Sequence, residues 1–459
     1  MVIREIYEKF AKESPVPVMV RAALEYALPA SFLDELFVEH AQRQYQGDLL
    51  FSTIVEMMSL VVCKIRPSMH AAYQERADEI GVSVKSVYNK INGVETQVSR
   101  ALVQATANRL GPVIDQMQGG RTPLLPGYAV RILDGNHLAA TEHRIEELRR
   151  IGSGPLPGQA LVVLDPDQML VTDVFPCEDG HAQERRIVLE LLEQVEAGQL
   201  WIADRNFCTA AFLWEVDHQQ ASYIIRQHAT NITWESAGQR RRVKRLRKEA
   251  TIYEQPVLIY DKAGQSMQAR RVTIVLDQPT RHGETEIHLL TNLPADVSAA
   301  KIAELYRQRW TIETAFGELA AVLNNEIDTL GDPQAALFAF CVGLLAYNVL
   351  SVVKAALRSI HGEEKVSADV SGYFLADEVR CVWKGMMIVV PACYWSDRFA
   401  GLTPAAMAKE LLRLAKKIRL RRFQKHPRKP KKKPPKRSSA KHNPHVSTAR
   451  ILAQRKSAA

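Results

Sequence analysis

Two aspartates that each follow a short strand-like apolar run are the residues best suited to chemistry in this sequence. Asp134 comes directly after Tyr128–Leu133, and Asp204 comes directly after Gln199–Ala203. If the two strands are neighbours, the carboxylates lie too close together for both to ionise cheaply without a cation. Hard divalent cations prefer such oxygen ligands. Taken singly, however, an aspartate at the end of a strand is usually a turn or capping residue.

A third group comes from a predicted long helix, Ser298–Asn325, which contains Tyr306, Arg309 and Glu313 at steps of three and four residues. This spacing places the three side chains on one side of the helix. Arg309 falls in line with the apolar positions, so we expect it to be partly buried. These three groups lie at the edge of the expected core. The carboxylate is suited to bind a metal ion, and the guanidinium and phenol beside it are suited to bind a phosphate group. An internal Arg309–Glu313 ion pair is the alternative.

These three segments, DGNHL at Asp134, IADRNF around Asp204 and YRQRWTIE at Tyr306–Glu313, resemble the catalytic motifs of DDE transposases. Specifically, they resemble the insertion-sequence-four family. Its signature is Tyr, two residues, Arg, three residues, Glu, six residues and Lys. The first three positions match at the required spacing, but the fourth falls on Ala320, so the lysine is missing.

The resemblance implies a ribonuclease H-like core in which Asp134, Asp204 and Glu313 bind two Mg²⁺ or Mn²⁺ ions. It further implies that Asp134 bridges both ions and that Tyr306 and Arg309 hold DNA phosphates near the scissile bond. Arg205, next to Asp204 in the second motif, is a further candidate for DNA contact.

Ala320 is the departure that bears on activity. A lysine there would contact a phosphate at the transposon end, which alanine cannot do. No basic residue lies between Arg309 and Lys354 to replace it. Because the acidic triad is intact, metal-dependent cleavage remains compatible with the sequence.

The first 120 residues have mostly helical spacing and are expected to form a DNA-binding region. Within residues 71–92, two short predicted helices flank Gly81-Val82-Ser83, and Ser83 is placed to cap the second. This layout is typical of a helix-turn-helix, in which Lys85 and Tyr88 would face a DNA groove. A plain helical hairpin gives the same pattern.

Changes in the pattern of helix-like and strand-like residues divide the rest of the chain into segments. The fold class is predicted as α/β, a ribonuclease H-like core with an inserted small β domain and helical N-terminal and C-terminal regions. The predicted segments are 121–230 for the first part of the core, 231–294 for the β insertion, 295–360 for the catalytic helix and remaining core, and 361–417 for a C-terminal helical region. The insertion begins with a basic run that includes Arg240, Arg241 and Arg242, predicted to contact phosphates.

Charge is distributed unevenly along the 459 residues. The net charge is +9, but residues 416–459 hold 17 Lys and Arg and no acid, which leaves 43 basic and 51 acidic residues, a net of −8, in the rest. Such a basic end favours a polyanionic partner, nucleic acid before membrane, although a solubilising tail has the same composition. Residues 418–459 are predicted to be a disordered basic tail.

Composition also excludes several classes. Gly 23 and Pro 22 exclude a collagen-like or broadly disordered chain, and six scattered cysteines without a CxxC pair are typical of reduced thiols in the cytoplasm. Pro333–Val353 carries no charge, but its Gln334, Tyr347 and Asn348 favour a buried core helix over a membrane span.

Together these observations predict a cytoplasmic DNA transposase. It would cut double-stranded DNA at the terminal inverted repeats of an insertion sequence and join the ends to target DNA, and the resemblance implies a homodimer on DNA. Two alternatives remain open: a catalytically silent, transposase-derived DNA-binding protein, and a metal-dependent nuclease without strand transfer.

Overall fold

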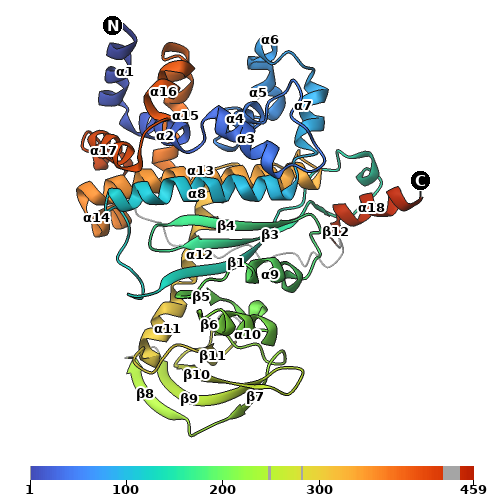
Figure 1. The fold of residues 1–459 in the computed structure, drawn as a ribbon, viewed down its shortest axis with the longest axis vertical. Coiled ribbons are helices and arrows are strands. Elements are labelled where there is room, and N and C mark those ends of the chain that lie inside the picture. The colour runs from blue at the N-terminus through green and yellow to red at the C-terminus, as the bar shows by residue number, and fades with distance from the viewer. Residues whose placement is uncertain (1, 247–249, 281–282, 427–444, 459) are drawn as a thin grey trace.

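The centre of the chain forms a mixed β-sheet in the computed structural model, which describes residues 2–246, 250–280, 283–426 and 445–458 (Figure 1). One half of the sheet has the strand order β4-β3-β1-β5-β6. β1 runs antiparallel to β3 and parallel to β5, and β5 runs parallel to β6. The strands are β1 (Ala129–His137), β3 (Gln159–Asp165), β4 (Leu170–Cys177), β5 (Gln199–Ala203) and β6 (Ser222–Arg226).

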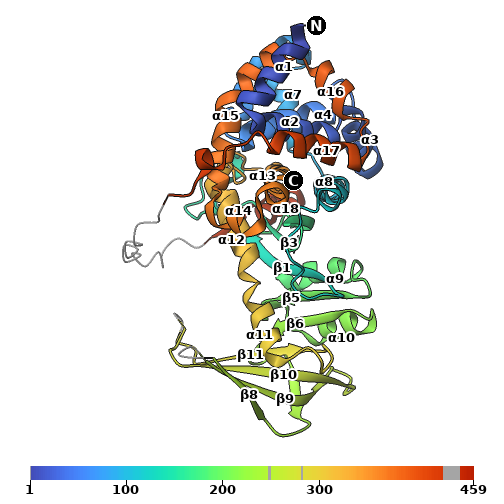
Figure 2. The same cartoon turned by 90° about the vertical axis from the view of Figure 1, so that its left-hand side faces the viewer.

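Both faces of this half-sheet are buried, because apolar residues occupy both sets of alternating positions. Ile132 on β1 and Ile202 on β5 belong to one core, whereas Leu133 and Ala203 belong to a second core on the opposite face. Figure 2 shows α11 (Ala299–Arg307) and α12 (Trp310–Val322) along one side of the sheet. The other side carries α9 (Glu184–Leu192) and α10 (Ala210–His218).

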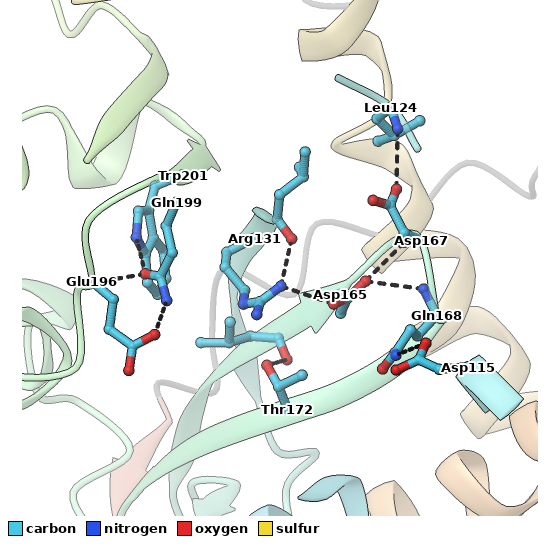
Figure 3. A network of polar contacts seen from close by, with 12 residues as sticks. Asp115, Leu124, Arg131, Asp165, Asp167, Gln168, Thr172, Glu196, Gln199 and Trp201 are labelled. Atoms are coloured by element: carbon cyan, nitrogen blue, oxygen red, sulfur yellow. Dashed lines mark hydrogen bonds and ion pairs between the residues drawn. The ribbon is translucent and has the colours of Figure 1, made fainter. Parts of the chain in front are cut away.

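The turn between β3 and β4 holds the start of β1 in place (Figure 3). One oxygen of Asp165 accepts hydrogen bonds from the backbone N–H groups of Asp167 and Gln168, and the other accepts one from Arg131 at 2.8 Å. The carboxylate of Asp167 then accepts the N–H of Leu124 at 3.1 Å. The Asp165-Pro166-Asp167 turn is thus joined to β1 by hydrogen bonds.

The predicted inserted β domain is not a separate unit. Its strands extend the core sheet, because β11 pairs antiparallel with β6 and the order continues through β10, β9 and β7, with β8 also on β9. The prediction of a separate β domain is therefore wrong. The pattern of residues along the chain does not reveal which distant strands pair with each other. The bounds are β7 (Thr233–Ser236), β8 (Arg241–Leu246), β9 (Ala250–Tyr260), β10 (Ser266–Leu276) and β11 (Glu286–Thr291).

Helices cover the β4 end of the sheet. α8 (Thr96–Gln116) and α13 (Pro333–His361) pack against each other and against β4, and the other N-terminal and C-terminal helices form a layer beyond them (Figure 1). That layer comprises α1 (Val2–Glu13), α2 (Pro15–Ala27), α3 (Ala30–His40), α4 (Phe51–Val62), α5 (Met69–Glu75), α6 (Ala77–Ile80), α7 (Val84–Ile91), α15 (Gly372–Val389), α16 (Ala392–Phe399) and α17 (Pro404–Ala415), while α14 (Glu363–Asp369) follows α13.

α13 is the charge-free segment that the sequence places in the core. It is long and apolar enough to cross a membrane, but 94% of its most apolar 18-residue window is buried inside the protein. The prediction of a core helix is therefore confirmed. Asp332 caps the helix by accepting the N–H of Gln334 at 3.0 Å, and Pro333 fits its first position.

The end of the chain differs from the predicted disordered tail of residues 418–459. Residues 427–444 lie outside the described residues, but β12 (Val446–Ser447) pairs with β2 (Pro155–Leu156), and α18 (Thr448–Ala458) follows it. Arg450 also binds Asp179 through paired contacts of 2.8–3.0 Å. The prediction of disorder is therefore wrong for residues 445–458. Their contacts come from β2 and Asp179, which are distant in the sequence.

The predicted single helix Ser298–Asn325 is broken between α11 and α12. Across the break, the N–H of Arg309 donates to the carbonyl of Tyr306 at 3.1 Å, and that of Thr311 donates to Gln308 at 2.8 Å. These three-residue steps are 3₁₀ turns, in which side chains three residues apart lie one above the other. The break therefore stacks Tyr306 and Arg309 on the same side.

Candidate active site

Asp134 and Asp204 occupy equivalent positions on neighbouring parallel strands. The last residue pair between β1 and β5 is Leu133 with Ala203, so each aspartate comes one residue after it. Since side chains alternate along a strand, both carboxylates project on the face of Ile132 and Ile202, which is the face that α11 and α12 cover. β1 itself continues to His137 beside β3, so Asp134 does not end its strand as predicted.

Arg309 lies between the acidic side chains and links them. Its Nη1 contacts Oδ2 of Asp134 at 3.2 Å, and its Nη2 contacts Oε1 of Glu313 at 2.7 Å. The hydroxyl of Tyr306 donates to Oδ1 of Asp204 at 3.4 Å. The structure therefore brings together five predicted residues: Asp134, Asp204, Tyr306, Arg309 and Glu313.

The guanidinium of Arg309 is buried with 11% of its side chain exposed, and its Nε has no hydrogen-bond partner among the described residues. Burial opposes its charge, but Tyr306 and the three carboxylates together keep the pKa of Arg309 above its usual value. Burial likewise raises the pKa of Tyr306, and the charge of Asp204 adds to this rise. Arg309 thus acts as the internal counter-cation of the acidic group.

Asp134 is a carboxylate whose ionisation is opposed by its burial in the site. Burial raises its pKa to about 6, and the charges of Glu313 and Asp204 add to this rise. The Arg309 guanidinium and the N–H of Gly135, which donates at 3.1 Å, offset it only in part. A buried carboxylate is typical of a functional site when neighbouring groups do not fully offset the cost of its negative charge.

This pKa predicts a pH dependence of stability. The folded chain holds the Asp134 proton more tightly than the unfolded chain, so stability is gained as the pH falls through about 6. Without divalent ions, the wild type is expected to gain about 1.4 kcal/mol relative to Asp134→Asn between pH 8 and pH 5. Denaturant unfolding of both proteins across that range measures the difference, and parallel curves would refute it.

The carboxylate oxygens suit Mg²⁺ or Mn²⁺ by donor chemistry. In the described ranges, however, no three acidic, histidine or cysteine side chains are close enough together to hold a metal ion. Arg309 occupies the position between Asp134 and Glu313 that a cation would take. The donor set therefore fits a divalent ion once this guanidinium moves away from the carboxylates.

The remaining candidates lie away from the carboxylates. Lys85 is exposed and Tyr88 half-buried on α7, within the helical layer beyond α8 and α13 (Figure 1). The first turn of α7 has the predicted cap, with the Ser83 hydroxyl accepting the N–H of Ser86. Arg241 and Arg242 are exposed on β8, and Arg240 just before it pairs with Glu286 at 3.4 Å. Their predicted DNA contacts stay predictions.

A hollow of about 440 Å³ opens next to Asp204, and strands of the predicted insertion line part of it. Arg205 is half exposed there and shares Glu284 with Arg226. Arg226 lies close enough to Tyr306 and Asp204 for their charges to help raise its pKa against the effect of burial. Sequence reasoning missed Arg226, although it ends β6, the parallel neighbour of β5, and the argument used for the aspartates would have found it.

Comparison with known proteins bears directly on this arrangement. Residues 125–349, which include all five of the clustered residues, match the family model described as transposase DDE domain. This stretch is therefore similar to a transposase DDE domain. This stretch contains β1 to β6, the insertion strands, α11, α12 and the first part of α13.

The curated proteins that this chain resembles are described as transposases as well. The chain is 26% identical over 277 residues to the transposase of insertion sequence element IS421 from Escherichia coli. The same identity relates it to InsL, assigned as the transposase of element IS186A in Escherichia coli strain K12. Each match covers 52% of this chain and 71% of the relative.

Proposed function

We propose that this chain is the transposase of an insertion sequence, which cuts double-stranded DNA at the terminal inverted repeats and joins the ends to target DNA by two-metal phosphodiester transfer. The observation that carries the proposal is the equivalent placement of Asp134 and Asp204 on β1 and β5, facing Glu313 across Arg309. The strand order β4-β3-β1-β5-β6 supports a ribonuclease H-like core. The Tyr306, Arg309 and Glu313 spacing supports the insertion-sequence-four family.

In this proposal Asp134, Asp204 and Glu313 would hold two Mg²⁺ or Mn²⁺ ions. When bound, the ions activate the attacking water or 3′-hydroxyl and stabilise the leaving oxygen. The strands fix the two aspartates, and α12 supplies Glu313 from the opposite side. Arg309 neutralises Asp134 and Glu313 in the absence of ions, and together with Tyr306 it would hold the phosphate next to the scissile bond.

The test is cleavage and joining of a DNA fragment that carries the element's own terminal repeat, with Mg²⁺, Mn²⁺ or EDTA. Metal-dependent cutting at the repeat and covalent joining to target DNA are the expected results. Cutting without joined products would identify a nuclease instead. A homodimer on paired ends, which the family resemblance implies, would appear as a two-protomer complex in sedimentation with end DNA.

A silent DNA-binding protein is the second candidate, and Ala320 is the observation that favours it. The missing lysine removes a phosphate contact near the catalytic helix, while the basic segments for DNA binding are retained. Tight binding of the terminal repeat without any cutting would establish this alternative.

Restoring the lysine is expected to strengthen end binding. Ala320 is exposed on α12, so Ala320→Lys adds a charge without disturbing the core. We expect about threefold to tenfold tighter binding of the end DNA and a salt dependence steeper by about one ion. Ala321→Lys is the matched control, because Ala321 is also exposed but points about 100° away around the helix. Equal gains in both variants would contradict a specific contact at position 320.

A further inference from the structure

A basic pocket of about 350 Å³ lies between α12 and α13, on a different side of α12 from the carboxylates. Its lining includes a single acidic residue, Glu318, which pairs with one of the cations. The cations come from separate parts of the chain: Arg121, Arg307, Lys354, Arg358 and Lys425. The lining therefore carries more cationic than acidic side chains, which favours the binding of an anion.

Arg358 is a buried cation of this pocket, and not all of its donors have partners. The residue is 7% exposed, and its Nε donates to the carbonyl of Gly119 at 2.8 Å. Its Nη2 is buried and has no hydrogen-bond partner among the described residues. Burial and the nearby charge of Arg121 lower the pKa of Arg358 to about 10. A buried donor without a partner is costly, so an incoming acceptor would be favoured at this position.

The other cations are held by the surrounding structure rather than by each other. The backbone N–H of Arg121 donates to Asp167 in the turn of Figure 3 at 2.7 Å, and its Nε pairs with Glu363 at 3.1 Å. Lys425 donates to the carbonyl of Ser367 at 2.6 Å. The pocket is therefore pre-organised, and a ligand would not have to order long side chains.

Two observations favour a nucleic-acid phosphate over a small free anion. Lys425 leads in sequence directly into residues 427–444, where 8 of 18 residues are Lys or Arg. Gln308 and Thr311, at the break between α11 and α12, also line the pocket. Arg309 lies at the same break but faces the carboxylates. A chain bound along this surface would contact the pocket and the break together.

We propose that the pocket between α12 and α13 binds a phosphate group of the DNA backbone, outside the catalytic site. This inference rests on the proposed function, which makes DNA the polyanion. The guanidinium groups would donate to the phosphate oxygens, as arginine does in bidentate phosphate contacts.

The decisive variant places a carboxylate inside the pocket. Thr314 is exposed and lines the hollow, so Thr314→Glu would occupy the anion position, whereas Thr314→Gln has the same size without the charge. Thr314→Glu is expected to raise the melting temperature, because the added carboxylate would lie in a mostly cationic lining. We expect inorganic sulfate to stabilise the wild type and Thr314→Gln saturably, and Thr314→Glu to lose this response.

Affinity for a 40-base-pair duplex, measured in EDTA so that no cutting occurs, tests the partner. We expect about tenfold weaker binding for Thr314→Glu than for Thr314→Gln, with a salt dependence shallower by about one ion. Equal affinities would overturn the proposal, and sulfate binding without any change in DNA binding would identify a small-anion site instead. Because no cleavage is measured, a failure of the catalytic proposal leaves this result interpretable.

Discussion

Asp134→Asn is expected to reduce metal-dependent DNA cleavage at least about a thousandfold, which corresponds to about 4 kcal/mol of transition-state stabilisation. Asparagine keeps the shape of the side chain but removes the negative charge that two cations would share. DNA binding in EDTA should change little, because a carboxylate does not attract phosphates.

Stability makes this result interpretable. Since burial raises the pKa of Asp134, the neutral asparagine is expected to unfold at the same or a higher temperature than the wild type at pH 8. Loss of cleavage would then not reflect misfolding. Asp296→Asn, an exposed aspartate before α11, is the matched control and should retain full cleavage. Cleavage by Asp134→Asn within tenfold of the wild type would remove Asp134 from the proposed metal site.

Arg309→Met is expected to destabilise the chain by about 3 kcal/mol in EDTA, because it leaves the buried carboxylates without their counter-cation. Mg²⁺ or Mn²⁺ should restore most of this loss, since a divalent ion can take the vacated position between Asp134 and Glu313. Arg309→Lys, which keeps the charge but loses the fork of donors, is expected to lose less.

Denaturant unfolding with EDTA and with Mg²⁺ measures both effects. Lys301→Met serves as the control on the preceding helix, because Lys301 makes a partly exposed ion pair with Glu304 at 3.0 Å. That variant should lose no more than about 0.5 kcal/mol and should not respond specifically to the ions. If Arg309→Met is equally unstable with and without divalent ions, the guanidinium does not stand in for a cation.

Local patterns were sufficient to predict much of the catalytic half of the sheet. β5 has the predicted bounds, Gln199–Ala203, because it is a short apolar run bounded by polar or turn residues. The convergence of Asp134 with Asp204 followed from one assumption, that β1 and β5 are neighbours. That assumption is correct in the structure.

Features that depend on distant contacts were not predictable in this way. The break between α11 and α12 falls within a sequence of good helical spacing, without Pro or Gly at the break. It coincides with Arg309, whose partner Asp134 is 175 residues away. The pairing of β12 with β2 and the basic pocket around Arg358 likewise join segments far apart in the chain. Neither composition nor periodicity contains this information.

The pairing of β11 with β6 has a consequence for how the protein could be shortened. β6 is hydrogen-bonded on both sides, and its Tyr223, Ile224 and Ile225 are fully buried. Removing residues 231–294 would leave this apolar strand as a bare sheet edge, a template for intermolecular strand addition. The insertion thus protects the catalytic sheet from aggregation, and a minimal catalytic fragment would need charged or proline substitutions along β6 to remain soluble.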